Sequence, residues 1–113
     1  MNTEAIKSEA HKKGYIYTFA ADNRPIAILY SFHAIDRMEK WQLSAEQVDE
    51  TMIFPEEVVS GHRGRYIAHR RYDDHLVRAV YEYENQLPIL ITVYFPYSQR
   101  YFSGGGRYED RIL

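Results

Sequence analysis

"GRYIAHRRYDDHLVRAVYEYENQLPILITVYF", residues 64–95, contains three runs of β-branched and aromatic residues separated by two short turns. The turns fall at Asp73-Asp74 and Asn85-Gln86. Asp and Asn tolerate left-handed backbone and suit two-residue hairpin loops, whereas Val, Ile and Tyr favour strands. The segment therefore predicts a three-stranded antiparallel meander, and residues 56–60 predict a shorter strand before it.

Alternation along these strands assigns the side chains to two faces. One face carries Arg65 opposite Glu82 and His69 opposite Arg78, together with the aliphatic Ile67, Val80, Ile89, Ile91 and Val93. The other carries Tyr66, Ala68, Arg70, Ala79, Tyr81, Tyr83, Leu90, Thr92 and Tyr94. We expect the aliphatic face to pack against helices and the second face to form a tyrosine-rich surface.

Two short helices are predicted before the meander. Ser31 is a suitable N-cap for a helix from Phe32 to about Trp41. Ser44 and Gln47 form a capping box for a second helix, with Leu43 and Val48 spaced as a hydrophobic staple around it. The second helix should end at residues 54–55, because proline disfavours helical geometry in the preceding residue.

The two ends of the chain give weaker patterns. Residues 3–13 are rich in helix formers and precede Gly14, which predicts a surface helix, and residues 15–30 predict two extended pieces around a turn at 21–24. The tail, 97–113, contains three consecutive glycines and is expected to be mobile or to order against a partner. The predicted fold is one α+β domain, with short N-terminal helices followed by an antiparallel sheet of about four strands. Its core spans about residues 28–95, with an N-terminal extension at 1–27.

Composition narrows the classes of protein to consider. The chain has 113 residues, no cysteine and a formal net charge of −2, so neither a disulfide framework nor a strongly basic nucleic-acid binder is indicated. No stretch approaches the roughly 20 apolar residues of a membrane span, and no signal-peptide pattern begins the chain. We expect a cytoplasmic protein without a membrane, metal or cofactor requirement.

Two groups of residues could carry chemistry. His33 and Arg37, four residues apart, share one face of the first predicted helix, where an imidazole could move a proton and a guanidinium could hold a phosphate. The more common interpretation of such spacing is an exposed helical surface, with Arg37 extended along it or paired to a carboxylate such as Asp36 or Glu39. Residues 62–78 hold the only clearly basic segment, which includes Arg63, Arg65, Arg70, Arg71 and Arg78 with His62, His69 and His75. Those arginines suit phosphate recognition, or else mark solvent-facing strand positions.

The stretches "YSFHAIDRMEKWQLSAEQVDETMIFPEEV" (30–58) and "GRYIAHRRYDDHLVRAVYEYENQLPILITVY" (64–94) resemble the family known as domain of unknown function 4258. The resemblance rests on a serine–x–histidine–alanine start, an arginine–methionine after it, a serine–x–glutamate–x–valine turn, a proline, and a final threonine–valine–tyrosine. These motifs fall on Ser31, His33, Ala34, Arg37, Met38, Ser44, Glu46, Val48, Pro55 and Thr92-Val93-Tyr94. The chain departs from the family where "KWQL" stands in place of the usual arginine–glycine before the capping serine.

What the resemblance implies is a fold similar to RelE-type toxins and the wider barnase–EndoU–colicin–RelE group. It also implies a component of a toxin–antitoxin pair, with RNA as substrate, a cognate antitoxin as partner, and a homodimer as a further option. A fold does not carry a function by itself, so these implications are expectations.

The leading hypothesis is a metal-independent endoribonuclease in which the RNA 2′-hydroxyl attacks the adjacent phosphate. The expected catalytic residues are His33, Arg37, Arg71 and Arg78, and the expected substrate-binding residues are Arg65, Arg70, Tyr66, Tyr81 and Tyr94. His33 would act as acid or base, the arginines would hold the phosphate, and tyrosines would stack bases. The alternative is a non-catalytic module that binds protein or nucleic acid through its tyrosine-rich sheet face.

Overall fold

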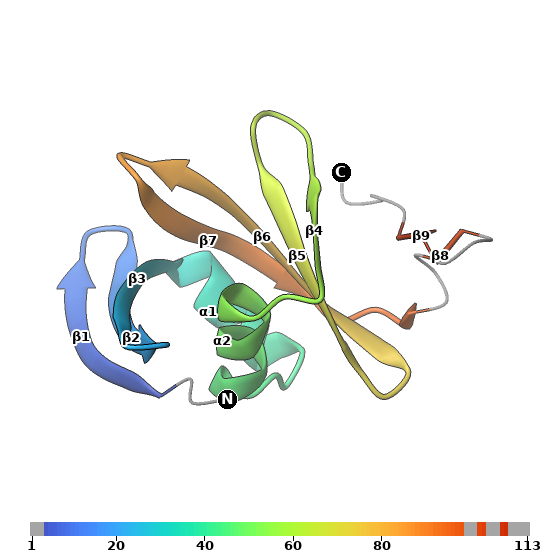
Figure 1. Ribbon diagram of the computed structural model, residues 1–113, viewed down its shortest axis with the longest axis horizontal. Coiled ribbons are helices and arrows are strands. Elements are labelled where there is room, and N and C mark those ends of the chain that lie inside the picture. Colours follow the sequence, from blue (N-terminus) through green and yellow to red (C-terminus); the bar gives the residue numbers. More distant parts are fainter. Residues whose placement is uncertain (1–3, 99–101, 104–106, 109–113) are drawn as a thin grey trace.

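Residues 5–94 form a seven-stranded sheet with two short helices, in a computed structural model that describes residues 4–98, 102–103 and 107–108 (Figure 1). The strands are β1 (Ala5–His11), β2 (Gly14–Ala21), β3 (Arg24–Ser31), β4 (Glu57–Ser60), β5 (Tyr66–Tyr72), β6 (His75–Glu84) and β7 (Leu87–Tyr94). Helices α1 (Phe32–Lys40) and α2 (Ala45–Ile53) connect β3 to β4. Strands β8 (Phe102–Ser103) and β9 (Arg107–Tyr108) pair with each other, and most of the predicted glycine-containing tail lies outside the described residues.

The strand order is β1-β2-β3-β7-β6-β5-β4, and the sheet is mixed. Neighbouring strands are antiparallel except β3 and β7, which run parallel through the pairs Leu29–Ile89 and Tyr30–Leu90. The predicted fold, a RelE-like antiparallel sheet of about four strands after N-terminal helices, is therefore wrong. Residues 5–31 add three strands to the meander, and the sheet is the dominant element of the molecule.

The N-terminal helix predicted over residues 3–13 is a strand. Ala5–His11 pairs with β2 in an antiparallel hairpin whose turn is Lys12-Lys13. Helix propensity is a weak preference that tertiary context overrides, and the aromatic β2 offers a backbone edge that seven residues of β1 can hydrogen-bond. The extended pieces predicted for residues 15–30 are confirmed as β2 and β3.

The helix starts agree with the predicted caps. The Ser31 side chain accepts a hydrogen bond from the Ala34 N–H, and Ser44 with Gln47 forms both halves of the capping box. Leu43 and Val48 are buried together in the core, as the predicted staple requires. The two helices are thereby set directly after β3, where they cover one face of the sheet (Figure 1).

The meander is confirmed, but the prediction of which face packs against the helices is wrong. The helix-side core contains Ala68, Val77, Ala79, Leu90 and Val93 with Ala34 of α1 and Val48 of α2, whereas Ile67, Val80 and Ile89 lie on the opposite face. Both faces of β5 and β6 are largely buried, so alternation alone does not reveal which one meets the helices. A bulge at Ile91 also shifts the alternation of β7, which moves Tyr94 to the face that carries His69 and Arg78.

Candidate active site

A row of four polar side chains crosses β4, β5, β6 and β7 on the face away from the helices. Glu57 pairs with His69, His69 with Arg78, and Arg78 with Tyr94. Directly opposed residues of antiparallel strands project from the same face of a sheet. The register therefore lines up a carboxylate, an imidazole, a guanidinium and a phenol, and we call these four residues the polar row.

The centre of the polar row is a buried pair. The Arg78 Nη1 atom donates a hydrogen bond to His69 Nε2 at 2.7 Å, and both residues are 0% exposed. Burial, reinforced by the charge of Arg78, lowers the pKa of His69 to about 3. A guanidinium has no acceptor, so Nε2 is the accepting nitrogen and the imidazole proton sits on Nδ1. His69 is thus neutral at ordinary pH and orients Arg78.

The ends of the polar row reach solvent. Glu57 and Tyr94 are each half-buried on either side of the His69–Arg78 pair. Arg71, two residues after His69 on β5, projects from the same face and is exposed. Its backbone N–H donates to the Glu56 carboxylate at 2.6 Å, which fixes this end of β5 against the residue before β4.

Residues 30–95 of the chain, which include the whole polar row, match the family model "Domain of unknown function (DUF4258)". This match covers more than half of the chain. The chain belongs to the DUF4258 family. No curated protein and no solved structure matches the chain.

The DUF4258 segment begins at the end of β3 and ends just after β7, so it contains both helices and the meander. Strands β1 and β2 and most of β3 lie outside it. Among the described residues, no helix is long and apolar enough to cross a lipid bilayer.

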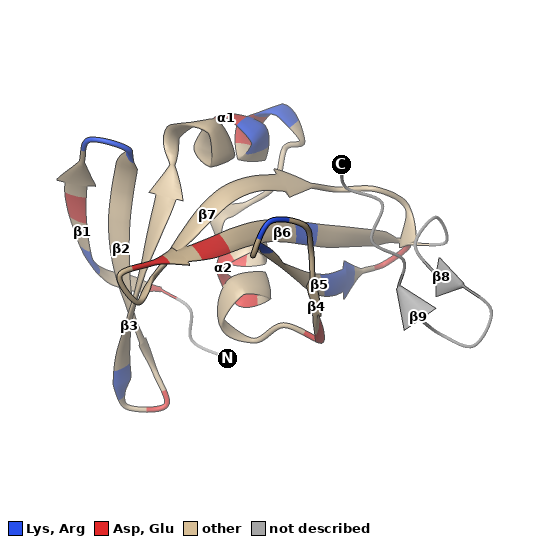
Figure 2. Cartoon of the chain, turned by 90° about the horizontal axis from the view of Figure 1, so that it is seen from above, with Lys and Arg blue, Asp and Glu red and all other residues tan. Residues whose placement is uncertain are grey.

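The DUF4258 sheet brings some of the predicted site residues together. Arg71, Arg78 and Tyr94 share the face of the polar row, and Figure 2 shows the basic positions on β5 and β6. Arg65 also projects from this face, because it precedes Tyr66, which projects from the other one. Its Nε lies 3.9 Å from the Glu82 carboxylate, near the opposite end of β5 from Arg71.

Three predicted binding residues lie on the helix side of the sheet. Arg70 donates from Nη1 to the Phe54 carbonyl oxygen at 2.6 Å, which ties β5 to the end of α2. Tyr66 and Tyr81 stack with ring centroids 5.6 Å apart. These three side chains are therefore separated from Arg71 and Arg78 by the sheet itself.

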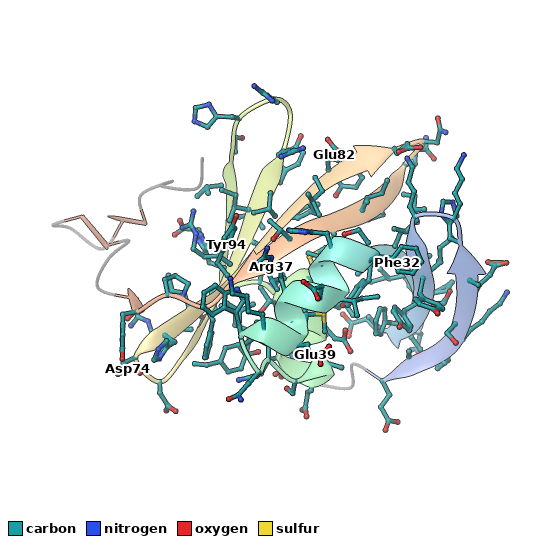
Figure 3. The ribbon with its side chains drawn as sticks, turned by 180° about the vertical axis from the view of Figure 1, so that it is seen from behind. Phe32, Arg37, Glu39, Asp74, Glu82 and Tyr94 are labelled. Atoms are coloured by element: carbon teal, nitrogen blue, oxygen red, sulfur yellow. The ribbon has the colours of Figure 1, made fainter. Side chains whose placement is uncertain are left out.

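His33 and Arg37 stand apart on α1. His33 is exposed and Arg37 is half-buried, and within the described part of the chain neither side chain makes a hydrogen bond or an ion pair. Helix α1 packs beside β7, and Figure 3 shows Arg37 on the helix in front of the strand that carries Tyr94. The two residues are near the sheet but are not joined to the polar row by any polar contact.

Sequence reasoning missed Glu57 as a site residue and did not assign a role to His69. The register between β5 and β6 was predictable, because a short turn links these strands. The pairing of β4 with β5 passes through the loop at residues 61–65, where Arg63 and Gly64 both have positive φ, and no turn motif in the sequence fixes that register.

Proposed function

We propose that this DUF4258 protein is a metal-independent endoribonuclease that acts at the polar row. The observation that carries the proposal is the strand register, which sets Glu57, His69, Arg78 and Tyr94 side by side. This set contains a carboxylate that can accept a proton and a cation that can offset the charge of the phosphate, and displacement at a phosphodiester uses both. It also contains a phenol that can stack on a base.

The proposed reaction is attack of an RNA 2′-hydroxyl on the adjacent phosphorus. The Glu57 carboxylate takes the proton from the 2′-hydroxyl while the 2′-oxygen bonds to phosphorus. The bond to the 5′-oxygen then breaks, and a water molecule gives a proton to that leaving oxygen. Tyr94 lies three strands from Glu57, about 14 Å away at the usual strand spacing, so it contacts a neighbouring nucleotide instead. The products are a 2′,3′-cyclic phosphate and a free 5′-hydroxyl, and no bound metal or cofactor takes part.

Two arginines supply the positive charge in this scheme. Arg71 is a diagonal neighbour of both Glu57 and Arg78 on the sheet face, and such neighbours lie about 7–8 Å apart. Arg71 is exposed and meets the phosphate, whereas Arg78 is buried and acts through its field. A charge in a low-dielectric interior acts more strongly over the same distance than one in water.

The test is cleavage of a labelled single-stranded RNA in EDTA, with the products analysed for a cyclic phosphate. Glu57→Gln should lower the rate by about 100-fold or more, the usual contribution of a positioned acid or base. Glu9→Gln is the matched control, because it makes the same change on the exposed strand β1 and should leave the rate unchanged.

His33→Ala distinguishes the two candidate positions for the site. With the reaction at the polar row, this variant keeps a rate within a few-fold of the wild type. Loss of cleavage in His33→Ala with full activity in Glu57→Gln would move the site to α1 and overturn the assignment to the polar row. Cleavage that no variant changes would contradict the ribonuclease.

In a cell, the proposed ribonuclease would be the toxin of a toxin–antitoxin pair held inactive by an antitoxin protein. Inducing the wild-type chain in a bacterial host should then arrest growth and fragment total RNA. Inducing Glu57→Gln to the same soluble level should do neither.

A second candidate, a non-catalytic binding module, is favoured by a cluster of tyrosines. Tyr66, Tyr81 and Tyr83 pack with ring centroids 5.6–5.8 Å apart, and Tyr83 is 56% exposed. Exposed tyrosines stack on unpaired bases and are frequent at protein interfaces. RNA that is bound but not cleaved, with binding lost in Tyr83→Ala and kept in Glu57→Gln, would favour this module over the enzyme.

A further inference from the structure

A cavity of about 570 Å³ lies between the first three strands and the two helices, on the side of the sheet opposite to the polar row. Cavities of roughly 300–1,000 Å³ are the size that small organic ligands occupy. It is lined by Glu4, Ala5, Tyr17, Phe19, Tyr30, Ile35, Met38, Ala45, Glu46 and Asp49. None of these residues takes part in the proposed ribonuclease, so this site is independent of that function.

The walls combine aromatic rings with acidic groups. Tyr17 meets the ring of Tyr30 edge-on with centroids 5.2 Å apart, and Phe19 continues this surface along β2. Among the described residues that line the cavity, every charged side chain is a carboxylate. The cavity therefore attracts positive charge and repels anions such as phosphate.

Asp49 is the best-placed of these carboxylates. It is only 8% exposed, and the Tyr30 hydroxyl donates a hydrogen bond to its Oδ1. A carboxylate has two oxygens with several acceptor directions, so one bond from a phenol leaves acceptor capacity for a ligand. The rings of Tyr17, Phe19 and Tyr30 line the same cavity, and the faces of such rings attract cations.

The titration of Asp49 agrees with this geometry. Burial and the neighbouring Glu46 raise its pKa while the hydrogen bond from Tyr30 lowers it, and the net result is a pKa of about 6. The other titratable groups among the described residues of this cavity are the phenols of Tyr17 and Tyr30 and the carboxylates of Glu4 and Glu46. At pH 7 the buried carboxylate is mostly ionised, and a cation beside it would offset the cost of that burial.

We infer that this cavity binds a small organic cation, namely a protonated amine attached to an aromatic or aliphatic body. The ammonium donates charge-assisted hydrogen bonds to Asp49, and the apolar body lies against Tyr17, Phe19 and Met38. The cavity's location between β1–β3 and the DUF4258 helices makes it a feature of the whole chain rather than of the family segment alone.

The test titrates the full chain with phenethylamine and with two isosteres, neutral 2-phenylethanol and anionic 3-phenylpropionate. Calorimetry measures affinity, and amide NMR shifts report which residues respond. Phenethylamine should bind at least tenfold more tightly than the alcohol, the anion should not bind, and the shifts should centre on Tyr30, Met38 and Asp49. Equal affinities for all three probes, or no binding of the amine up to millimolar concentration, would refute the inference.

Two variants locate the ligand. Asp49→Asn keeps an acceptor for the Tyr30 hydroxyl but removes the charge, and it should weaken amine binding tenfold or more. Ala45→Phe fills the cavity from an exposed position on α2 and should abolish binding even if Asp49→Asn fails to fold. The control Glu9→Gln should bind as the wild type does, and undiminished binding in both cavity variants would place the amine elsewhere.

The pH dependence provides a separate readout. An alkylamine resembles lysine and stays protonated from pH 5 to 8, so only the protein titrates in this range. Amine affinity should fall as the pH drops below about 6, where Asp49 takes up a proton. An affinity that is constant across this range would contradict a role for Asp49.

Discussion

Asp49 and His69 are buried ionisable residues whose pKa values shift with opposite consequences for stability in acid. Folding lowers the pKa of His69 from 6.5 to about 3. Between these pH values the unfolded chain binds more protons than the folded chain, so stability declines as the pH is lowered. Folding raises the pKa of Asp49 from 3.8 to about 6. Between these pH values the folded chain binds more protons than the unfolded chain, so stability increases as the pH is lowered. The two contributions oppose each other between about pH 4 and 6.

Asp49→Asn should therefore make the protein more sensitive to acid. Removing the compensating carboxylate leaves the His69 contribution unopposed, so the free energy of unfolding should fall more steeply from pH 6 to pH 4 than in the wild type. The difference should be on the order of 1–3 kcal/mol across this range. Urea unfolding at pH 4, 5, 6 and 7 measures it.

The reciprocal variant checks the sign. His69→Gln keeps an acceptor for Arg78 but does not titrate, so its stability should fall less than that of the wild type over the same acid range. Parallel pH profiles for the wild type and both variants would show that neither group controls acid stability.

At the scale of single elements, sequence motifs predicted structure correctly wherever the interacting residues lie within a few positions of each other in the chain. The caps at Ser31 and Ser44 and the hairpin turns of the meander act through neighbours two to four residues away. The helix prediction for the segment that forms β1 was wrong because its partner in the sheet, β2, cannot be recognised from local propensity. The polar row was predictable only in part. The short turn between β5 and β6 fixes the pairing of His69 with Arg78, but no short turn fixes the pairing of Glu57 with His69.

The start of β2 depends on a close approach that only glycine permits. A Cβ at Gly14 would lie 1.9 Å from the Tyr30 carbonyl oxygen, so Gly14→Ala must push β2 away from β3. We expect a loss of about 1–3 kcal/mol of stability, as for other overpacked sites. Amide hydrogen exchange should accelerate at Tyr30 and Ser31, which face this contact.

Gly64→Ala is the control for that substitution. Gly64 has a φ of +73° and open space around it, so alanine there strains the backbone without a clash. Its effect on hydrogen exchange should stay within the loop before β5. Faster exchange at Tyr30 in Gly64→Ala but not in Gly14→Ala would contradict the close-approach argument.

At the scale of the whole molecule, β1 is an edge strand that contributes little to the core. Its side chains are exposed except His11, which is half-buried, and its backbone covers the edge of β2. Unpaired strand edges promote association with other chains. The strand therefore replaces the aromatic β2 at the edge of the sheet with an edge that carries the charges of Lys7 and Glu9, which discourage such association.

A chain shortened to residues 14–113 should still fold. It should lose about 1 kcal/mol of stability, or roughly 4–8 °C in Tm for a domain of this size. The uncovered, aromatic β2 should cause self-association that grows with concentration, measured by light scattering beside the full chain. An unfolded or strictly monomeric shortened chain would contradict this role for β1.

The sequence by itself determined the two capped helices, the meander with its turns and the DUF4258 membership, because each depends on residues close together in the chain or on a linear motif. Only the tertiary structure decided the parallel contact of β3 with β7, the face that meets the helices, the pairing of Glu57 with His69, and the joining of Tyr30 to Asp49. These features are contacts between segments that are far apart in the sequence. Their registers are set by the free energy of burying both sheet faces, which no local pattern encodes.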